Sequence, residues 1–192
     1  MAYAKAPDSQ HIEQVRAQVG SFLNTHHNPC FAKGATFIEE SFEVFELPAE
    51  RISIAARSPK GISEFLLKTR RWHHQISQNG AAVGFALSGA ANNFGGGWSL
   101  QAVFASRLAA KLARAIEMID RQRPGEDTEA IYVTIPAYRV VCFLLRGYSS
   151  EEVFVVRSTN VALGPMEGKF YTAADFLEAI LQTRPVRGMV MK

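Results

Sequence analysis

Residues 72–106 read WHHQISQNGAAVGFALSGAANNFGGGWSLQAVFAS, and this stretch contains no Asp, Glu, Lys or Arg. At the chain average of 20% charged residues, about seven charges would be expected over such a length. Six of the 14 glycines also lie within it. A segment that avoids charge is usually buried, in its own domain, against a partner chain or in a membrane. We therefore expect the rest of the chain to be organised around this stretch.

The charge-free stretch predicts a strand, a loop and the start of a helix. Ala81 to Leu87 is a short apolar run after a turn signal, which is typical of a buried strand. Ser88 to Gly97 consists largely of small residues and predicts a loop. Ser99 is a candidate cap for the following helix, with Trp98 in a hydrophobic staple. That helix has an apolar inner face and a basic outer stripe, namely Phe104, Leu108, Leu112, Ala115 and Ile119 inside and Arg107, Lys111, Arg114 and Arg121 outside.

The chain before this stretch predicts helices and one strand. Apolar residues from Ile12 to Leu23 recur at helical spacing, after Asp8 or Ser9 as a cap. Residues 35–47 are compatible with helix or strand, and a stripe of glutamates at i, i+4 and i+7 favours a helix. Arg51 to Arg57 alternates between apolar and polar side chains and predicts a half-buried strand. Ser58-Pro59 then predicts the start of a helix whose inner face reaches Ile76.

The chain after this stretch predicts three strands and a closing helix. The strands are Ile131–Ile135, Tyr138–Leu145 and Val153–Arg157, and the second contains an uninterrupted apolar run that is typical of a central strand. Thr172 can cap the closing helix, whose inward-facing residues are Leu177, Ile180 and Leu181. Together these elements predict the α+β class. We expect an antiparallel three- to five-stranded sheet packed against about four to five helices, in a single domain over residues 1–192 with frayed ends at residues 1–8 and 186–192.

Composition narrows the class of protein. The chain is 47% hydrophobic, which is enough for a sizeable core and argues against global disorder. Basic and acidic residues number 21 and 18, a near balance that makes nucleic acid an unlikely partner. Two cysteines form no disulfide framework and favour a reducing compartment. With no apolar signal-peptide core in Met1 to Gln10, we expect a soluble, cytoplasmic protein.

Cys30 is the candidate catalytic residue. It follows Asn28-Pro29, a pattern that resembles a helix start, and a thiol in a first helical turn acquires thiolate character. His26 and His27 are close enough in sequence to supply a general base. The competing interpretation is a small core residue, which is how Cys142 is used within its apolar run.

Two further kinds of site are disfavoured. The glycine-rich loop lacks the spacing of a dinucleotide or phosphate-binding motif, and Trp98 stands where a phosphate would have to approach. The pairs His26-His27 and His73-His74 suggest a metal site, but adjacent residues on a helix point about 100° apart. We assign no metal and no cofactor to this chain.

No motif in the sequence identifies an activity, and the first hypothesis is a non-catalytic binding module. It would dock a protein partner or a second copy near the glycine-rich loop 89–98, which we expect at the surface and mobile until covered. The candidate binding residues are Gly95, Gly96, Gly97, Trp98, Arg107, Lys111 and Arg114. One alternative is a cysteine-dependent hydrolase or transferase that uses Cys30. The other is a membrane-active protein that inserts the charge-free segment 72–106, a partner class that we consider possible but do not favour.

Overall fold

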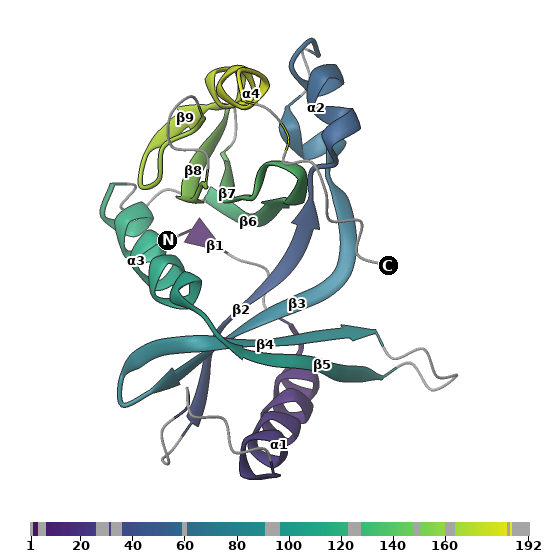
Figure 1. Cartoon of the computed structure of the whole chain (residues 1–192), viewed down its shortest axis with the longest axis vertical. Coiled ribbons are helices and arrows are strands. Elements are labelled where there is room, and N and C mark those ends of the chain that lie inside the picture. The colour runs from purple at the N-terminus through teal and green to yellow at the C-terminus, as the bar shows by residue number, and fades with distance from the viewer. Residues whose placement is uncertain are drawn as a thin grey trace. The chain divides into compact units, whose positions relative to one another are not determined.

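The computed structural model describes residues 2–3, 7–25, 31, 36–58, 61–90, 97–122, 128–147, 150–159, 164–183 and 185 (Figure 1). Its α-helices are α1 (Ser9–Thr25), α2 (Ala49–Ala55), α3 (Arg107–Gln122) and α4 (Ala173–Leu181). The short 3₁₀ helices are η1 (Ile62–Phe65) and η2 (Pro136–Tyr138). The strands are β1 (Ala2–Tyr3), β2 (Thr36–Glu46), β3 (Leu67–Gln78), β4 (Ala81–Ala90), β5 (Trp98–Ala105), β6 (Thr128–Ile135), β7 (Val140–Arg146), β8 (Glu151–Arg157) and β9 (Phe170–Thr172).

The sheet corrects the predicted fold class. Eight strands follow the hydrogen-bonding order β5-β4-β3-β2-β6-β7-β8-β9, and the two-residue β1 pairs with β6. The sheet is mixed, because β1 and β2 both run parallel to β6. The antiparallel three- to five-stranded sheet that we expected is therefore wrong in strand number and in direction. Ala2–Tyr3 also belong to the sheet, although we expected residues 1–8 to be frayed.

The described chain divides into two compact units, each built from separate pieces of sequence. Unit 1 comprises residues 1–3, 45–69 and 118–192, and unit 2 comprises residues 4–44 and 70–117. The strands β2 and β3 and the helix α3 each continue from one unit into the other. The single domain that we expected stays a prediction.

Unit 1 has a core between its strands and the helices α2 and α4. The apolar run of β7 supplies Val140, Cys142 and Leu144 to this core from one face, and Phe143 and Leu145 are buried on the other face, which confirms that this strand is covered on both faces. From α4, Phe176, Leu177 and Ile180 are buried in the same cluster. Thr172 caps α4 by accepting a hydrogen bond from the Asp175 N–H at 3.1 Å, as the sequence predicts. Leu181, by contrast, is 47% exposed, so its predicted inward orientation is wrong.

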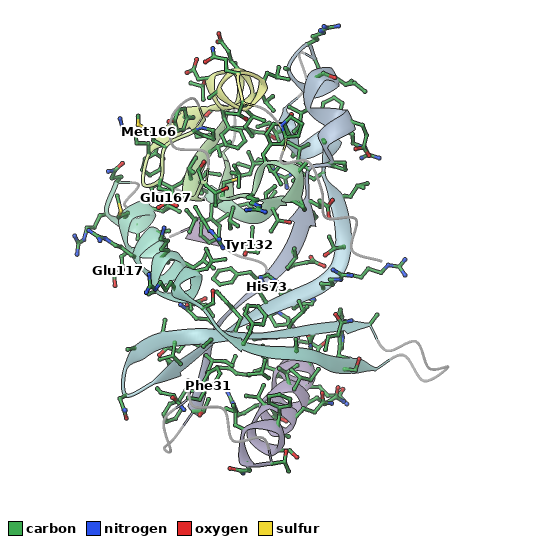
Figure 2. All side chains as sticks on the ribbon, in the orientation of Figure 1. Phe31, His73, Glu117, Tyr132, Met166 and Glu167 are labelled. Carbon is green, nitrogen blue, oxygen red and sulfur yellow. The ribbon has the colours of Figure 1, made fainter. Side chains whose placement is uncertain are left out.

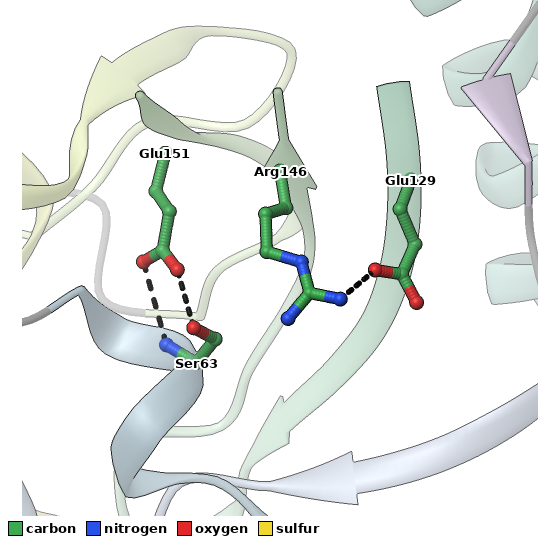
Figure 3. Close-up of polar contacts among 4 residues, drawn as sticks. All are labelled: Ser63, Glu129, Arg146 and Glu151. Carbon is green, nitrogen blue, oxygen red and sulfur yellow. Dashed lines mark hydrogen bonds and ion pairs between the residues drawn. The ribbon is translucent and has the colours of Figure 1, made fainter. Parts of the chain in front are cut away.

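A carboxylate of β8 holds the short helix η1 in place. Glu151 accepts hydrogen bonds from both the backbone N–H and the hydroxyl of Ser63, as Figure 3 shows. A Cβ atom at Gly61 would overlap this carboxylate, so a larger residue there would require the Glu151 side chain to move. On the neighbouring strands, Arg146 of β7 forms an ion pair with Glu129 of β6 across their antiparallel register.

Unit 2 is built on an antiparallel arrangement of β3, β4 and β5. Asn79 and Gly80 join β3 to β4 with positive φ values of 53° and 74°, which is the geometry of a type I′ hairpin turn. The predicted turn signal is thus confirmed. The helix α1 packs on one face of these strands, where Val15, Val19, Ile76 and Ala86 form a buried cluster with Phe31. Asp8 accepts the His11 N–H at 2.7 Å, which confirms Asp8 as the cap of α1.

The two faces of β3 carry different histidines. Trp72, His74 and Ile76 share the face that α1 covers, whereas His73 contacts the rings of Phe85 and Phe104. Figure 2 shows Phe31 and His73 on opposite sides of the β4–β5 ribbon. On the His73 side, the Gln75 side-chain amide donates a hydrogen bond to the Ala109 carbonyl of α3 at 2.8 Å.

Several predicted elements have the wrong type. Residues 36–46, which we favoured as a helix, form β2. The alternating segment 51–57, predicted as a strand, lies largely in α2. The helix predicted from Ser58-Pro59 to Ile76 is instead η1 followed by β3. Residues 99–105, predicted as the first turns of a helix, form β5, and α3 begins after Ser106.

Candidate functional site

Four buried polar residues in unit 2 form one connected group, which we call the His–Ser cluster: His11, Ser41, His74 and Ser88. They come from α1, β2, β3 and β4 respectively. Their exposed fractions are 2%, 7%, 0% and 0%. Because buried polar side chains need hydrogen-bond partners, the contacts among these four residues decide whether the group stabilises or destabilises the fold.

The Ser88 hydroxyl is the centre of the His–Ser cluster. It lies 2.7 Å from Nε2 of His74 and 2.9 Å from Nε2 of His11. The other ring nitrogen of His74, Nδ1, lies 2.8 Å from the Ser41 hydroxyl. A chain of hydrogen bonds therefore runs from Ser41 through His74 and Ser88 to His11. It links three strands to α1.

Strand register explains why Ser88 meets His74. Trp72 pairs with Ser88 and His74 with Ala86, so these four residues point to the same face of the sheet. His11 reaches this face from the first turn of α1, where Asp8 caps the helix. Further along α1, the Gln18 side-chain oxygen accepts the Leu100 N–H at 2.7 Å. Polar contacts thus fix both the rotation and the position of α1 on the sheet.

Two indole rings border the His–Ser cluster. Trp98 stacks on the His11 imidazole, with ring centroids 4.1 Å apart and planes 10° from parallel. Trp72 meets His11 edge-on at 5.7 Å. Trp72 is buried, whereas Trp98 is half-buried. The Trp72 Nε1–H has no hydrogen-bond acceptor among the residues that the structure describes. Trp98 is thus the member of this group that reaches the surface.

Burial favours the neutral imidazoles of His11, His73 and His74. Burial lowers the pKa of His74 to about 3, and the imidazoles of His11 and His73 act in the same direction. The pKa of His73 falls to about 4, mainly through burial and further through the Arg71 guanidinium. The pKa of His11 is also lowered by burial, while the Asp8 carboxylate opposes that shift. Neutral imidazoles suit the cluster, because each can accept a hydrogen bond on one ring nitrogen and donate from the other.

The His–Ser cluster contains the parts of an activated serine but lacks access to a substrate. A serine on Nε2 of a histidine whose Nδ1 is held by a further group is the arrangement of nucleophile, base and orienting residue. Here the serine and the base are both 0% exposed. In this conformation the cluster is a structural connection between α1 and the strands.

The sequence-predicted site residues fall into three groups. Cys30, His26, His27, Gly95 and Gly96 lie outside the described residues, so their roles stay predictions. Gly97 and Trp98 are half-buried at the start of β5. Beyond the other end of that strand, Arg107, Lys111 and Arg114 are exposed along α3. The structure therefore does not bring Trp98 and the basic stripe together.

Sequence reasoning missed the His–Ser cluster. The sequence singled out His74 only as half of the pair His73-His74, a suggested metal site. In the structure these two residues lie on a strand and point to opposite faces. Within the described ranges, no group of three His, Cys, Asp or Glu residues could hold a metal ion. No helix of the described part is long and apolar enough to cross a membrane. An uncharged strand that carries His and Ser at buried positions was the available signal.

Comparison of the chain with protein-family models, with characterised proteins and with solved structures finds no match.

Proposed function

We propose that this protein is a non-catalytic binding module that docks a protein partner on unit 2 beside β5, with Trp98 as the anchor. The observation that carries the proposal is the stacking of the half-buried Trp98 ring on the buried His11 imidazole at 4.1 Å. Aromatic side chains dominate the energetics of protein interfaces, and an anchor already held in place loses little entropy on binding. Trp98 combines both properties.

The His–Ser cluster supports this proposal by what it does to Trp98. His11 is held from two sides, by Ser88 on its ring and by Asp8 on its backbone N–H. The imidazole is therefore a fixed platform for the indole. A ring that is fixed on one face and reaches solvent elsewhere is suited to insertion into a pocket of a partner.

The basic stripe of α3 would act separately from this anchor. Arg107, Lys111 and Arg114 are exposed, and surface charges influence the rate of association more than the final affinity. If the partner is acidic, charge reversal at Arg114 will slow association and weaken its salt dependence. The half-life of the complex will still depend mainly on Trp98.

The test uses peptides selected from a displayed random library against the whole protein. Trp98→Ala is expected to weaken the selected peptides by roughly 2 kcal/mol, or about thirtyfold in Kd. Leu181→Ala is the matched control, since Leu181 is a 47% exposed apolar residue of unit 1. Circular dichroism establishes that both variants are folded. The proposed site would be refuted if the selected peptides bound Trp98→Ala with the same Kd as the wild type, or if the library yielded no binder.

A further inference from the structure

The outer edge of β5 is open in the part of the chain that the structure describes. β5 is the terminal strand of the hydrogen-bonding order, and among the described residues it pairs only with β4. It is eight residues long and contains no charge and no proline. Proteins usually protect such edges with charged side chains, proline, bulges or a covering segment, because an open edge accepts another strand.

The first half of β5 has this protection. The register with β4 shifts between Leu87 and Ser88, where Leu87 pairs with Ala102 and Ser88 with Leu100, so Gln101 is an extra residue in a bulge. The neighbouring Leu100 N–H is already bonded to Gln18 of α1 at 2.7 Å. Both protective features end at Gln101.

The second half of β5 directs backbone groups outward. The Ser106 N–H donates to the Val83 carbonyl of β4 at 3.1 Å. The backbone N–H and C=O groups at the even positions from 102 to 106 therefore point toward β4. A Cβ atom at Gly84 would overlap the Phe104 carbonyl oxygen, which agrees with this direction. The N–H and C=O groups of Val103 and Ala105 therefore point away from the sheet.

We propose that a second copy of this chain pairs with the outer edge of β5, antiparallel to it and related by a two-fold axis at Phe104. Val103 of each copy then faces Ala105 of the other, and the two pairs make four backbone hydrogen bonds. Phe104 faces its own counterpart in the close, non-hydrogen-bonded pair between them. The inference rests on the proposed function in taking β5 as the binding strand, and it names the partner.

Self-complementarity selects a second copy as the occupant. A two-fold axis at position 104 places that residue opposite its own counterpart, so a charge there would meet a like charge, and such pairs are destabilising. The segment 102–106 has no charge, and its central side chain, Phe104, is 37% exposed. Aromatic residues facing each other across strands are favourable. Arg107, the first residue of α3, lies three residues from the axis, so the two Arg107 side chains do not face each other.

The register of the proposed dimer can be tested by placing opposite charges at position 104 in the two copies. Sedimentation or light scattering is expected to give a wild-type mass about twice that of the 21.2 kDa chain at high concentration. Phe104→Lys and Phe104→Glu should each weaken the dimer by at least about tenfold, because like charges then face each other. An equimolar mixture of the two variants should recover the dimer. A mixture that stays monomeric beside a dimeric wild type would overturn the register.

A second pair of variants tests the backbone pairing. Ala105→Pro removes an outward N–H and leaves the bonds to β4 intact, so the chain should fold and become monomeric. Ala105→Val keeps the N–H and should remain dimeric. A dimeric Ala105→Pro protein, or a wild type that is monomeric at every concentration, would overturn the inference.

Failure of this inference is distinguishable from failure of the proposed function. If the wild type is monomeric but selected peptides lose affinity in Trp98→Ala, the proposed function stands and the second copy is refuted. If the charge-exchange mixture dimerises while no peptide depends on Trp98, the β5 dimer stands and the Trp98 anchor is refuted.

Discussion

A single hydroxyl, that of Ser88, meets two imidazoles, and this constrains the protons of the His–Ser cluster. A hydroxyl donates one hydrogen bond and can accept two, so with neutral rings at most one histidine accepts from Ser88 and at least one donates to it. The tautomer of His74 that sets the role of Nε2 toward Ser88 also sets whether Nδ1 donates to or accepts from the Ser41 hydroxyl. The residues of the cluster therefore stabilise α1 on the sheet as a unit, and the loss of one member affects all its neighbours.

Acid should destabilise the protein well above the range in which carboxylates titrate. His74 and His73 have folded pKa values of about 3 and 4, below the ordinary value of 6.5 that they regain on unfolding. Below pH 6.5 the unfolded chain thus binds more protons, and stability falls as the pH falls toward the folded values. The expected loss is roughly 1.4 kcal/mol per pH unit for each histidine that stays neutral in the fold. Urea titrations from pH 7.5 to 5.0 measure it.

His74→Gln is the control for this pH dependence. It removes one titrating group, so a folded variant should lose stability less steeply between pH 6.5 and 5.0. His73→Gln is the parallel substitution on the other face of β3. A wild-type unfolding free energy that is constant from pH 7.5 to 5.0 would show that these imidazoles are not held neutral.

The two cysteines should differ in reactivity. Burial raises the pKa of the Cys142 thiol well above its ordinary value, and that side chain is 1% exposed. We expect iodoacetamide to modify Cys30 faster near neutral pH, with a midpoint below the ordinary value of about 8.5. Peptide mass spectrometry after timed alkylation distinguishes the sites, and Cys30→Ser supplies the background rate of Cys142. Alkylation of Cys30 only after unfolding would end the hydrolase alternative.

The contacts within the His–Ser cluster could not have been predicted from the sequence, because they join distant positions. Ser88 and His11 are 77 residues apart, and Ser41 and His74 are 33 apart. Which side chains meet depends on the register of β3 with β4 and on the rotation of α1. The sequence alone determines neither. Trp98, in contrast, was named from the sequence as the aromatic anchor of the glycine-rich loop, and that role stays a proposal.

At the scale of elements, burial on both faces explains the misassigned β2. A half-buried strand alternates, but residues 41–44 of β2 are all buried, so the alternation that identifies a strand is lost. The glutamates at 39, 43 and 46 then match helical spacing by chance. The strand-prone residue types of this segment were the better guide.

The opposite error occurred in α2. Ile52, Ile54 and Ala56 appear to alternate, yet Ile52 and Ala55 are the buried residues and Ile54 is 57% exposed. Seven residues contain fewer than two helical turns, so both periods fit the apolar positions. Elements with long or unambiguous patterns were predicted correctly, including α1, the body of α3 and the three strands β6, β7 and β8.

The register of α3 gives a prediction at this scale. Leu112 is 0% exposed, as its position on the apolar face predicts, while Arg114 is exposed. Leu112→Ala should lower the free energy of unfolding by roughly 2–5 kcal/mol, because it leaves a cavity in a packed site. Arg114→Ala is the matched control and should change it by less than about 0.5 kcal/mol. Equal denaturant midpoints for the two variants would mean that the helix face is wrongly assigned.

At the scale of the whole molecule, the division into two units does not divide the chain into two pieces. Unit 2 is formed by two separated segments, and β2, β3 and α3 cross its boundary without interruption. Breaking either unit therefore removes part of a strand or helix that continues into the other. Independent domains are usually joined by linkers that few contacts cross. Continuous elements favour joint unfolding instead.

The chain supplies a separate probe for each unit, which makes this expectation testable. Both tryptophans, Trp72 and Trp98, lie in unit 2, and Cys142 lies buried in unit 1. In a Cys30→Ser background, tryptophan fluorescence and Cys142 alkylation should report the same urea midpoint, because a cooperative transition gives coincident curves for different probes. Phe143→Ala in unit 1 should shift both curves together. Midpoints that separate, or a Phe143→Ala shift seen by Cys142 alone, would show that the single domain predicted from chain length is two domains that unfold independently.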